Sequence, residues 1–386
     1  MTKIILVTWR RRKKSEFSGG ITRLMFLYGV IKHIVNPSEI SEFTLEDMDT
    51  KTSKIIAAIA RYSISSSFES TLREYRFYFV SCNKILKEIT KSKEKTILIL
   101  DHIRSILIIK KCISEILRYK PIIIHISHDY SAEFPYNLTT LSSLNKLTLS
   151  LLNKLNPLII TVSERDKVLY EENAKVSNVI VFPNIYPVLD SKFNAIDYEV
   201  KKDNNELVIN IVKPTIDKSY LIVLNQLVKL LDKYYFNNYP IKLRIISSNQ
   251  SLSLNNMTKS KIHIELKNNI PDRLEYLKYL SQGHIGLIEL YADRSSGTNV
   301  RRYDYALAAT VPFLHHMNVQ GEPLLREWSF KDIYDLVTKL SFFTPKELYL
   351  YGLENKSFII NIFYKYFNEL INTLRSLIIK LNTLSF

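Results

Sequence analysis

The sequence predicts an α/β fold of two domains, each with a parallel sheet, that face each other across a cleft. The chain has 386 residues, which is too long for one ordinary hydrophobic core. Continuous runs of Ile, Leu and Val recur along it, as expected for parallel strands buried on both faces. Helical stretches lie between these runs, and the alternation occurs twice, which favours two doubly wound sheets.

The first set of strands and helices fills the amino-terminal half of the chain. The strands are expected at Ile4–Thr8, Thr96–Leu100, Ile122–Ile126, Leu158–Val162 and Val179–Phe182. Amphipathic helical segments are expected at Thr71–Lys91 and Ile106–Tyr119. We therefore expect a Rossmann-like domain over residues 1–187.

The second set follows the polar stretch Leu189–Glu206, the best candidate for a linker. Its strands are expected at Leu207–Val212, Lys242–Ser247, Ile262–Leu266, Ile285–Leu290 and Pro312–His315. A helix is expected at Ser219–Tyr234, and the tail from Ser357 to Leu384 has a helical period. We expect a second Rossmann-like domain over residues 188–356 and a C-terminal helix over 357–386 that packs back toward the first domain.

The composition is that of a soluble globular protein, with 46% hydrophobic and 24% charged residues. Cys82 and Cys112 offer no framework of disulfide bridges and no paired metal-ligand spacing, so a reducing, cytoplasmic interior is the simplest assumption. The first apolar run is too short for a signal peptide, and there is no apolar run of about 18 residues that could span a membrane.

The segment Gly283–His315 carries the strongest functional signal. It reads as a strand, a polar loop over Asp293–Asn299, a helix over Val300–Ala309 and a second strand. Free N–H groups at the start of such a helix favour a phosphate. Arg301 and Arg302 oppose the helix dipole, which suggests an anion bound there, whereas the alternative is an ordinary connection with a surface basic pair.

The sequence motif S-G-T-N-V-R-x-x-D-Y-x-x-A, from Ser296 to Ala308, resembles the nucleotide-sugar loop of retaining family-4 glycosyltransferases with the GT-B fold. Arg301 stands where that family has Lys, and Asp304 stands where it has Glu. The first glutamate of the family's E-x7-E pair falls on Ser296, which leaves the choice of sugar open. Glu289 or Asp293 are candidates to replace it.

The resemblance extends to the ends of other predicted strands. It implies a donor diphosphate gripped by Lys213 and Lys218, and a base held near Ile270. It also implies a cleft loop at Gly19-Gly20, where a backbone without side chains approaches a ligand closely. The alternative for the two lysines is a pair of solvated side chains. The implied donor site is completed by Ser296, Gly297, Thr298, Asn299, Val300, Arg301 and Asp304.

The strand Ile122–Ile126 leads into His128-Asp129, and the resemblance implies a catalytic pair here whose histidine reaches the reacting sugar. His125 is the weaker candidate, because strand alternation favours the opposite face. Asp101-His102, after the preceding strand, is interpreted as structural or as part of the acceptor side.

These features together imply a hexosyltransferase, with a first domain for the acceptor and a second for a UDP- or GDP-linked sugar. No metal and no cofactor besides the nucleotide sugar are expected. A saccharide or lipid-linked acceptor is expected, and the formal charge of +15 favours the lipid-linked one, at the anionic surface of the inner membrane face. Nucleic acid is not expected, because no nucleic-acid-binding motif accompanies the charge.

Two other functions stay open at this point. A nucleotide-sugar 2-epimerase has the same fold and needs no acceptor. A degenerate, non-catalytic protein that binds a nucleotide or nucleic acid is compatible with the missing glutamate and glycines.

Overall fold

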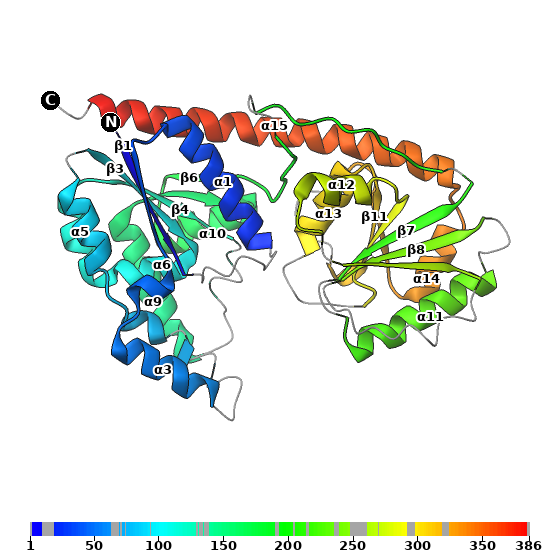
Figure 1. Ribbon diagram of the computed structural model, residues 1–386, viewed down its shortest axis with the longest axis horizontal. Helices are drawn as coiled ribbons and strands as arrows, with labels where there is room; N and C mark the ends of the chain where they lie inside the picture. Colours follow the sequence, from blue (N-terminus) through cyan, green and yellow to red (C-terminus); the bar gives the residue numbers. More distant parts are fainter. Residues whose placement is uncertain are drawn as a thin grey trace. The chain divides into compact units, whose positions relative to one another are not determined.

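The structure is a computed structural model. It describes residues 2–9, 19–62, 69, 72–73, 75–92, 94–128, 130, 134, 139–189, 193–203, 205–213, 216–234, 239–247, 261–268, 270–291, 298–318 and 324–383. The chain divides into two compact units, one of Met1–Pro183 with Tyr366–Phe386 and one of Asn184–Lys365. Each is an α/β unit with helices on both sides of its sheet (Figure 1).

The first unit is built on a parallel sheet in the order β2-β1-β3-β4-β5-β6. Its strands are β1 (Thr2–Thr8), β2 (Glu39–Phe43), β3 (Lys95–Asp101), β4 (Ile122–Ile126), β5 (Leu158–Thr161) and β6 (Val179–Val181). Its helices are α1 (Gly19–Val35), α2 (Leu45–Met48), α3 (Lys51–Arg61), η1 (Arg76–Tyr78), α5 (Asn83–Lys91), α6 (His102–Ile109), η2 (Lys110–Cys112), α7 (Ile113–Arg118), α9 (Thr139–Leu155) and α10 (Glu164–Ala174).

The second unit has a parallel sheet in the order β12-β11-β10-β7-β8-β9. Its strands are β7 (Leu207–Val212), β8 (Ile241–Ile246), β9 (His263–Lys267), β10 (Ile285–Ile288), β11 (Val311–His315) and β12 (Trp328–Phe330). Its helices are α11 (Lys218–Tyr234), α12 (Arg273–Leu280), α13 (Thr298–Leu307), η4 (His316–Asn318) and α14 (Ile333–Leu340). The last helix, α15 (Pro345–Thr383), contributes residues to both units.

Most of the predicted strands are buried on both faces, and such strands have continuous apolar runs. Ile4 and Ile5 are adjacent in β1 and point to opposite faces, yet both are fully buried, so helices cover both sides of the sheet. The ten predicted strands are all present. β2 and β12 lie at sheet edges and are not among the predicted strands. The sequence of β2, EISEF, is only half buried and therefore carries no continuous apolar run.

Two of the predicted helices are interrupted. In the segment Thr71–Lys91, η1 is followed by non-helical backbone at Phe79–Cys82 before α5 begins. In Ile106–Tyr119, the 3-10 turn η2 separates α6 from α7. Both segments keep their apolar period across the break, so periodicity alone does not show it.

Two sets of hydrogen bonds hold α1 and α10 at the carboxyl edge of the first sheet. The guanidinium of Arg23, in α1, is buried and donates hydrogen bonds to four carbonyls at the carboxyl ends of β4, β5 and β6: those of Ser127, Ile160, Thr161 and Phe182. The Oγ of Ser163 accepts a hydrogen bond from the Asp166 N–H at 3.1 Å, which makes it the N-cap of α10. α1 and α10 are thereby fixed where the candidate site begins.

Cys82 and Cys112 form a disulfide bridge with a Cα–Cα distance of 6.2 Å. The expectation that this pair forms no bridge is wrong. Cys82 precedes α5 and Cys112 ends η2, and the contact of α5 with α7 brings the two cysteines together although they are 30 residues apart. The assumption of a reducing interior therefore loses its basis.

Among the residues described, no helix is long and apolar enough to cross a lipid bilayer.

Candidate functional site

The second sheet has its topological switch point between β7 and β10, because the chain moves outward in opposite directions from these two strands. In doubly wound sheets a ligand binds beyond the carboxyl ends of the strands at such a point. Lys213 directly follows β7 and Glu289 directly follows β10. These two residues therefore meet at the place where a ligand is expected.

Glu289 joins two of the predicted donor-site cations. Its Oε2 lies 2.5 Å from the Lys213 Nζ, and its Oε1 lies 2.5 Å from the Arg301 Nη2. Arg301 also donates from Nη1 to the Val212 carbonyl at 3.0 Å. The Glu289 side chain is 1% exposed, whereas those of Lys213 and Arg301 are each 14% exposed. We refer to these three residues as the Glu289 cluster.

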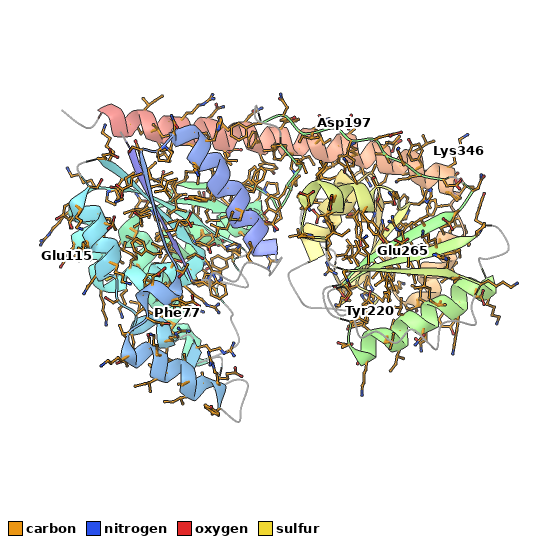
Figure 2. All side chains as sticks on the ribbon, in the orientation of Figure 1. Phe77, Glu115, Asp197, Tyr220, Glu265 and Lys346 are labelled. Carbon is orange, nitrogen blue, oxygen red and sulfur yellow. A yellow bond between two sulfur atoms is a disulfide. The ribbon has the colours of Figure 1, made fainter. Side chains whose placement is uncertain are left out.

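The surroundings of the Glu289 cluster are aromatic. The Lys213 Nζ lies 5.2 Å from the centre of the Tyr220 ring and 6.0 Å from that of Tyr291. Figure 2 shows Tyr220 at α11. Burial, followed by the nearby Glu289 carboxylate, raises the pKa of Tyr220 well above its usual value, so its hydroxyl stays neutral. For Arg301, burial acts to lower the pKa, but the attraction to Glu289 outweighs it and the pKa is raised.

The amino end of α13 approaches the same edge. The helix begins at Thr298, and the half-buried Val300 and Arg301 belong to its first turn. Thr298 and Asn299 are described by their backbone alone, and the predicted Ser296 and Gly297 lie outside the described residues. The structure thus places a helix N-terminus and a cation in one turn.

Arg302 is 1% exposed and lies outside this cluster. Its Nε and Nη2 pair with the two Glu327 carboxylate oxygens at 2.5 and 2.6 Å. The suggestion that Arg301 and Arg302 both recruit an anion is wrong for Arg302. Its charge is already compensated by a carboxylate, and its position anchors α13 to the segment before β12.

The remaining predicted donor residues are spread over this unit. Asp304 is buried and pairs with the Arg273 Nη2 at 2.5 Å, and Arg273 also donates to the Tyr186 carbonyl. Lys218 is the exposed first residue of α11, and Ile270 is buried in the segment that follows β9. Their roles toward a ligand stay predictions.

A second polar cluster lies at the carboxyl edge of the first sheet, at its own switch point between β1 and β3. The His128 Nε2 lies 2.6 Å from the Asp101 Oδ1, and the Thr8 Oγ1 donates to the Asp101 Oδ2 at 2.7 Å. Asp101 is fully buried, and the His128 side chain is 12% exposed. The predicted partner Asp129 lies outside the described residues.

His102 lies beside this histidine and connects it to Trp9 and Arg104. The Trp9 and His102 rings are 5.2 Å apart, the His102 and His128 rings are 5.8 Å apart, and the Arg104 guanidinium lies 4.4 Å from the centre of the Trp9 ring. The sequence gives no signal that Asp101 contacts His128. That contact depends on β3 lying beside β4, which follows from the sheet order alone.

Two other expectations concern the same edge. Gly19 and Gly20 are the first two residues of α1, whereas the sequence interpretation places them in a loop before the helix, and their role toward a ligand stays a prediction. His125 is fully buried, with its Nδ1 3.2 Å from the Leu100 carbonyl, so it belongs to the core. In the part of the chain that the structure describes, no group of three or more His, Cys, Asp or Glu side chains is arranged to hold a metal ion.

No family model and no curated protein matches the sequence. Solved structures do match. The chain spans 55% of the length of a TarM mutant from S. aureus, with 12% identity over 72% of this chain and a TM-score of 0.49.

Two other structures match over nearly their full lengths. One is described as trehalose-6-phosphate from E. coli bound with UDP-2-fluoro glucose, with a TM-score of 0.56 and 12% identity over 97% of this chain and 99% of that one. The other is the lipopolysaccharide outer core galactosyltransferase WaaB, with a TM-score of 0.56 and 11% identity over 96% of this chain and 99% of that one. The chain has the GT-B architecture of two Rossmann-like domains with parallel sheets.

Proposed function

We propose that the protein is a glycosyltransferase that moves a hexose from a UDP- or GDP-linked sugar to a saccharide or lipid-linked acceptor. The observation that supports this most is the Glu289 cluster. Lys213 and Arg301, two cations expected to hold the donor diphosphate, meet at the switch point of the second sheet, beside a helix N-terminus. The GT-B fold and the S-G-T-N motif also support a glycosyltransferase.

The cluster has a charge suited to a diphosphate. In the Glu289 cluster one carboxylate faces two cations, so these three residues together keep a net positive charge next to the N–H groups of α13. A bound diphosphate competes with Glu289 for the same ammonium and guanidinium. In the transition state negative charge grows on the departing nucleotide, and these donors, already paired with the bound diphosphate, stabilise that charge.

Each predicted residue has a role in this proposal. Lys218 adds a solvent-facing cation to the phosphate site, and the backbone near Ile270 holds the base. Asp304 accepts hydrogen bonds from the nucleotide ribose once the Arg273 guanidinium releases the Asp304 Oδ1. His128, oriented by Asp101, positions the transferred sugar.

The proposed chemistry is cleavage of the sugar C1–O bond as oxocarbenium character grows, with retention of configuration as in family 4. The lysine and arginine side chains supply the positive charge that a metal ion supplies in other transferases, so we expect turnover that does not depend on added metal. An assay in the presence of EDTA checks this: an unchanged rate agrees, and a loss restored by Mg²⁺ or Mn²⁺ contradicts it.

The proposed setting is the cytoplasmic side of a membrane, and this proposal rests on charge alone, because the Cys82–Cys112 bridge removes the argument from reduced cysteines. The formal charge of +15 favours an anionic surface, and a lipid-linked saccharide would bring the acceptor to that surface. The first unit, with its cluster around His128, is proposed to bind the acceptor.

A screen of UDP- and GDP-sugars for release of the nucleoside diphosphate tests this function. Release that increases with a saccharide or lipid-linked acceptor supports a transferase, and NMR of the product shows whether the anomeric configuration is retained. Conversion of the sugar without any acceptor would instead identify an epimerase. No binding of any nucleotide would leave the degenerate, non-catalytic alternative.

A further inference from the structure

α3 exposes apolar side chains at the centre of its solvent face. Ile55 is 59% exposed, Ile59 is 52% exposed, and Tyr62, directly after the helix, is 86% exposed. These positions follow the spacing i, i+4 and i+7, so they form one stripe along the helix. The opposite side of α3 is anchored by the buried residues Ser53 and Ala60. The stripe therefore faces away from the core of the unit.

The charges around this stripe are all positive within the helix. α3 has the sequence KTSKIIAAIAR, with the exposed cations Lys51, Lys54 and Arg61 and no carboxylate. The acidic residue just before it, Asp49, is buried and already pairs with Arg76. An apolar stripe with flanking cations is the pattern of a helix that lies in the plane of a membrane interface.

α3 is also connected to the candidate acceptor side. It packs on η1, and the Phe77 ring of η1 lies 5.7 Å from the Arg104 guanidinium, which covers the Trp9 ring at 4.4 Å. Figure 1 shows α3 at the outer edge of the first unit. A continuous series of contacts thus leads from the element under α3 through Arg104, Trp9 and His102 to His128.

We propose that the exposed face of α3, formed by Ile55, Ile59 and Tyr62 with Lys51, Lys54 and Arg61, docks the first unit onto an anionic phospholipid surface. The apolar side chains enter the boundary between headgroups and acyl chains, and the three cations contact the lipid phosphates. A second copy of the chain fits this face less well, because a twofold contact would bring the same cations together. This inference rests on the proposed function in one respect, since a lipid-linked acceptor gives the docking its purpose.

The test measures binding to vesicles of equal parts phosphatidylglycerol and phosphatidylcholine, and to vesicles of phosphatidylcholine alone. We expect the full chain to bind the anionic vesicles at low salt and to bind far less at high salt. Ile55→Ser with Ile59→Ser should lower the affinity at least about 10-fold, since each replaces an apolar side chain that enters the interface. Replacing Lys51, Lys54 and Arg61 by Gln should lower it on the order of 100-fold.

Ile222→Ser is the matched control, because Ile222 is an isoleucine on α11 with 60% exposure. It should bind vesicles as the unaltered chain does. The proposal is overturned if the unaltered chain binds no vesicles, if the α3 variants bind as well as it does, or if sedimentation shows a dimer that only the α3 variants lose. Thermal shifts with UDP and GDP on the same variants separate the two proposals, because vesicle binding without any nucleotide binding contradicts the proposed function and leaves the docking surface intact.

Discussion

Glu289 is a buried carboxylate whose backbone has a φ of 52°. Residues other than glycine rarely adopt this conformation, and where they do, surrounding interactions hold them in place. Here the ion pairs with Lys213 and Arg301 provide that hold. The position thus combines an uncommon backbone conformation with a buried charge that pairs with two cations.

Replacing Glu289 by Gln should lower the free energy of unfolding by about 3 kcal/mol, because two largely buried cations lose their shared counter-charge. UDP or GDP should stabilise this variant more than it stabilises the unaltered chain, since the diphosphate restores the missing negative charge. Urea unfolding with and without nucleotide measures both effects. Glu354→Gln, which removes an exposed pair with Arg326, is the control and should leave the free energy of unfolding nearly unchanged. Equal stability of the two variants would contradict the assigned role.

Asp101 is interpreted as a positioning residue for His128. In Asp101→Asn the ring loses its charged partner, so its orientation toward the sugar should become less defined. We expect donor turnover to fall on the order of 100-fold while the thermal shift produced by the nucleotide stays the same. An unchanged turnover would show that the contact is structural only, and a lost thermal shift would show a defect in folding.

At the scale of elements, α13 is held at both ends. Its first turn belongs to the Glu289 cluster. Near its carboxyl end the Tyr198 hydroxyl donates to the Leu307 carbonyl at 2.7 Å, and the Lys202 ammonium donates to the Ala309 carbonyl. A cation at this end also complements the helix dipole. The segment before β7 thus fixes the helix whose other end is expected to bind the donor.

Lys202 should make stability depend on pH. Burial lowers the pKa of Lys202 from 10.5 to about 7, so between these values the unfolded chain binds more protons than the folded one. The free energy of unfolding should therefore rise as pH increases from about 7 to about 10, by about 1.4 kcal/mol per pH unit at most. His284, which faces Lys202, has a pKa lowered by burial to about 3 and contributes no titration in this window.

Urea unfolding at several pH values between 7 and 10 checks this assignment. Lys202→Met should remove most of the rise, whereas Lys201→Met, at the exposed neighbouring position, should keep it. Parallel pH profiles for the unaltered chain and Lys202→Met would disprove the role of Lys202.

The disulfide between Cys82 and Cys112 should stabilise the first unit. It closes a loop of 30 residues, and in the chain-entropy model such a bridge contributes about 3 to 4 kcal/mol. Cys82→Ser with Cys112→Ser should lower the midpoint of unfolding, and dithiothreitol should have the same effect on the unaltered chain. Two free thiols titrated in denatured, unreduced protein would show instead that the bridge does not form.

At the scale of the whole molecule, the sequence predicts the central strands well because burial on both faces imposes continuous apolar runs. The edge strand β2 is only partly buried, so its sequence has no continuous apolar run and does not predict a strand. The site residues likewise differ in how far the local sequence predicts them. The position of Arg301 follows from a local sequence motif. The contact of Glu289 with Lys213 depends instead on β7 lying beside β10, which the local sequence does not reveal.

The central claim is that a nucleotide sugar binds at the carboxyl edge of the second sheet. A thermal-shift measurement with UDP, GDP and ADP on Lys218→Ala tests it most directly, because Lys218 is exposed and its removal should leave the fold intact. Lys229→Ala, an exposed lysine of the same helix, is the control. We predict that one nucleotide raises the melting temperature of the unaltered chain and of Lys229→Ala, and that Lys218→Ala loses most of this shift. The claim would be contradicted by no shift with any nucleotide, or by an equal shift in both variants.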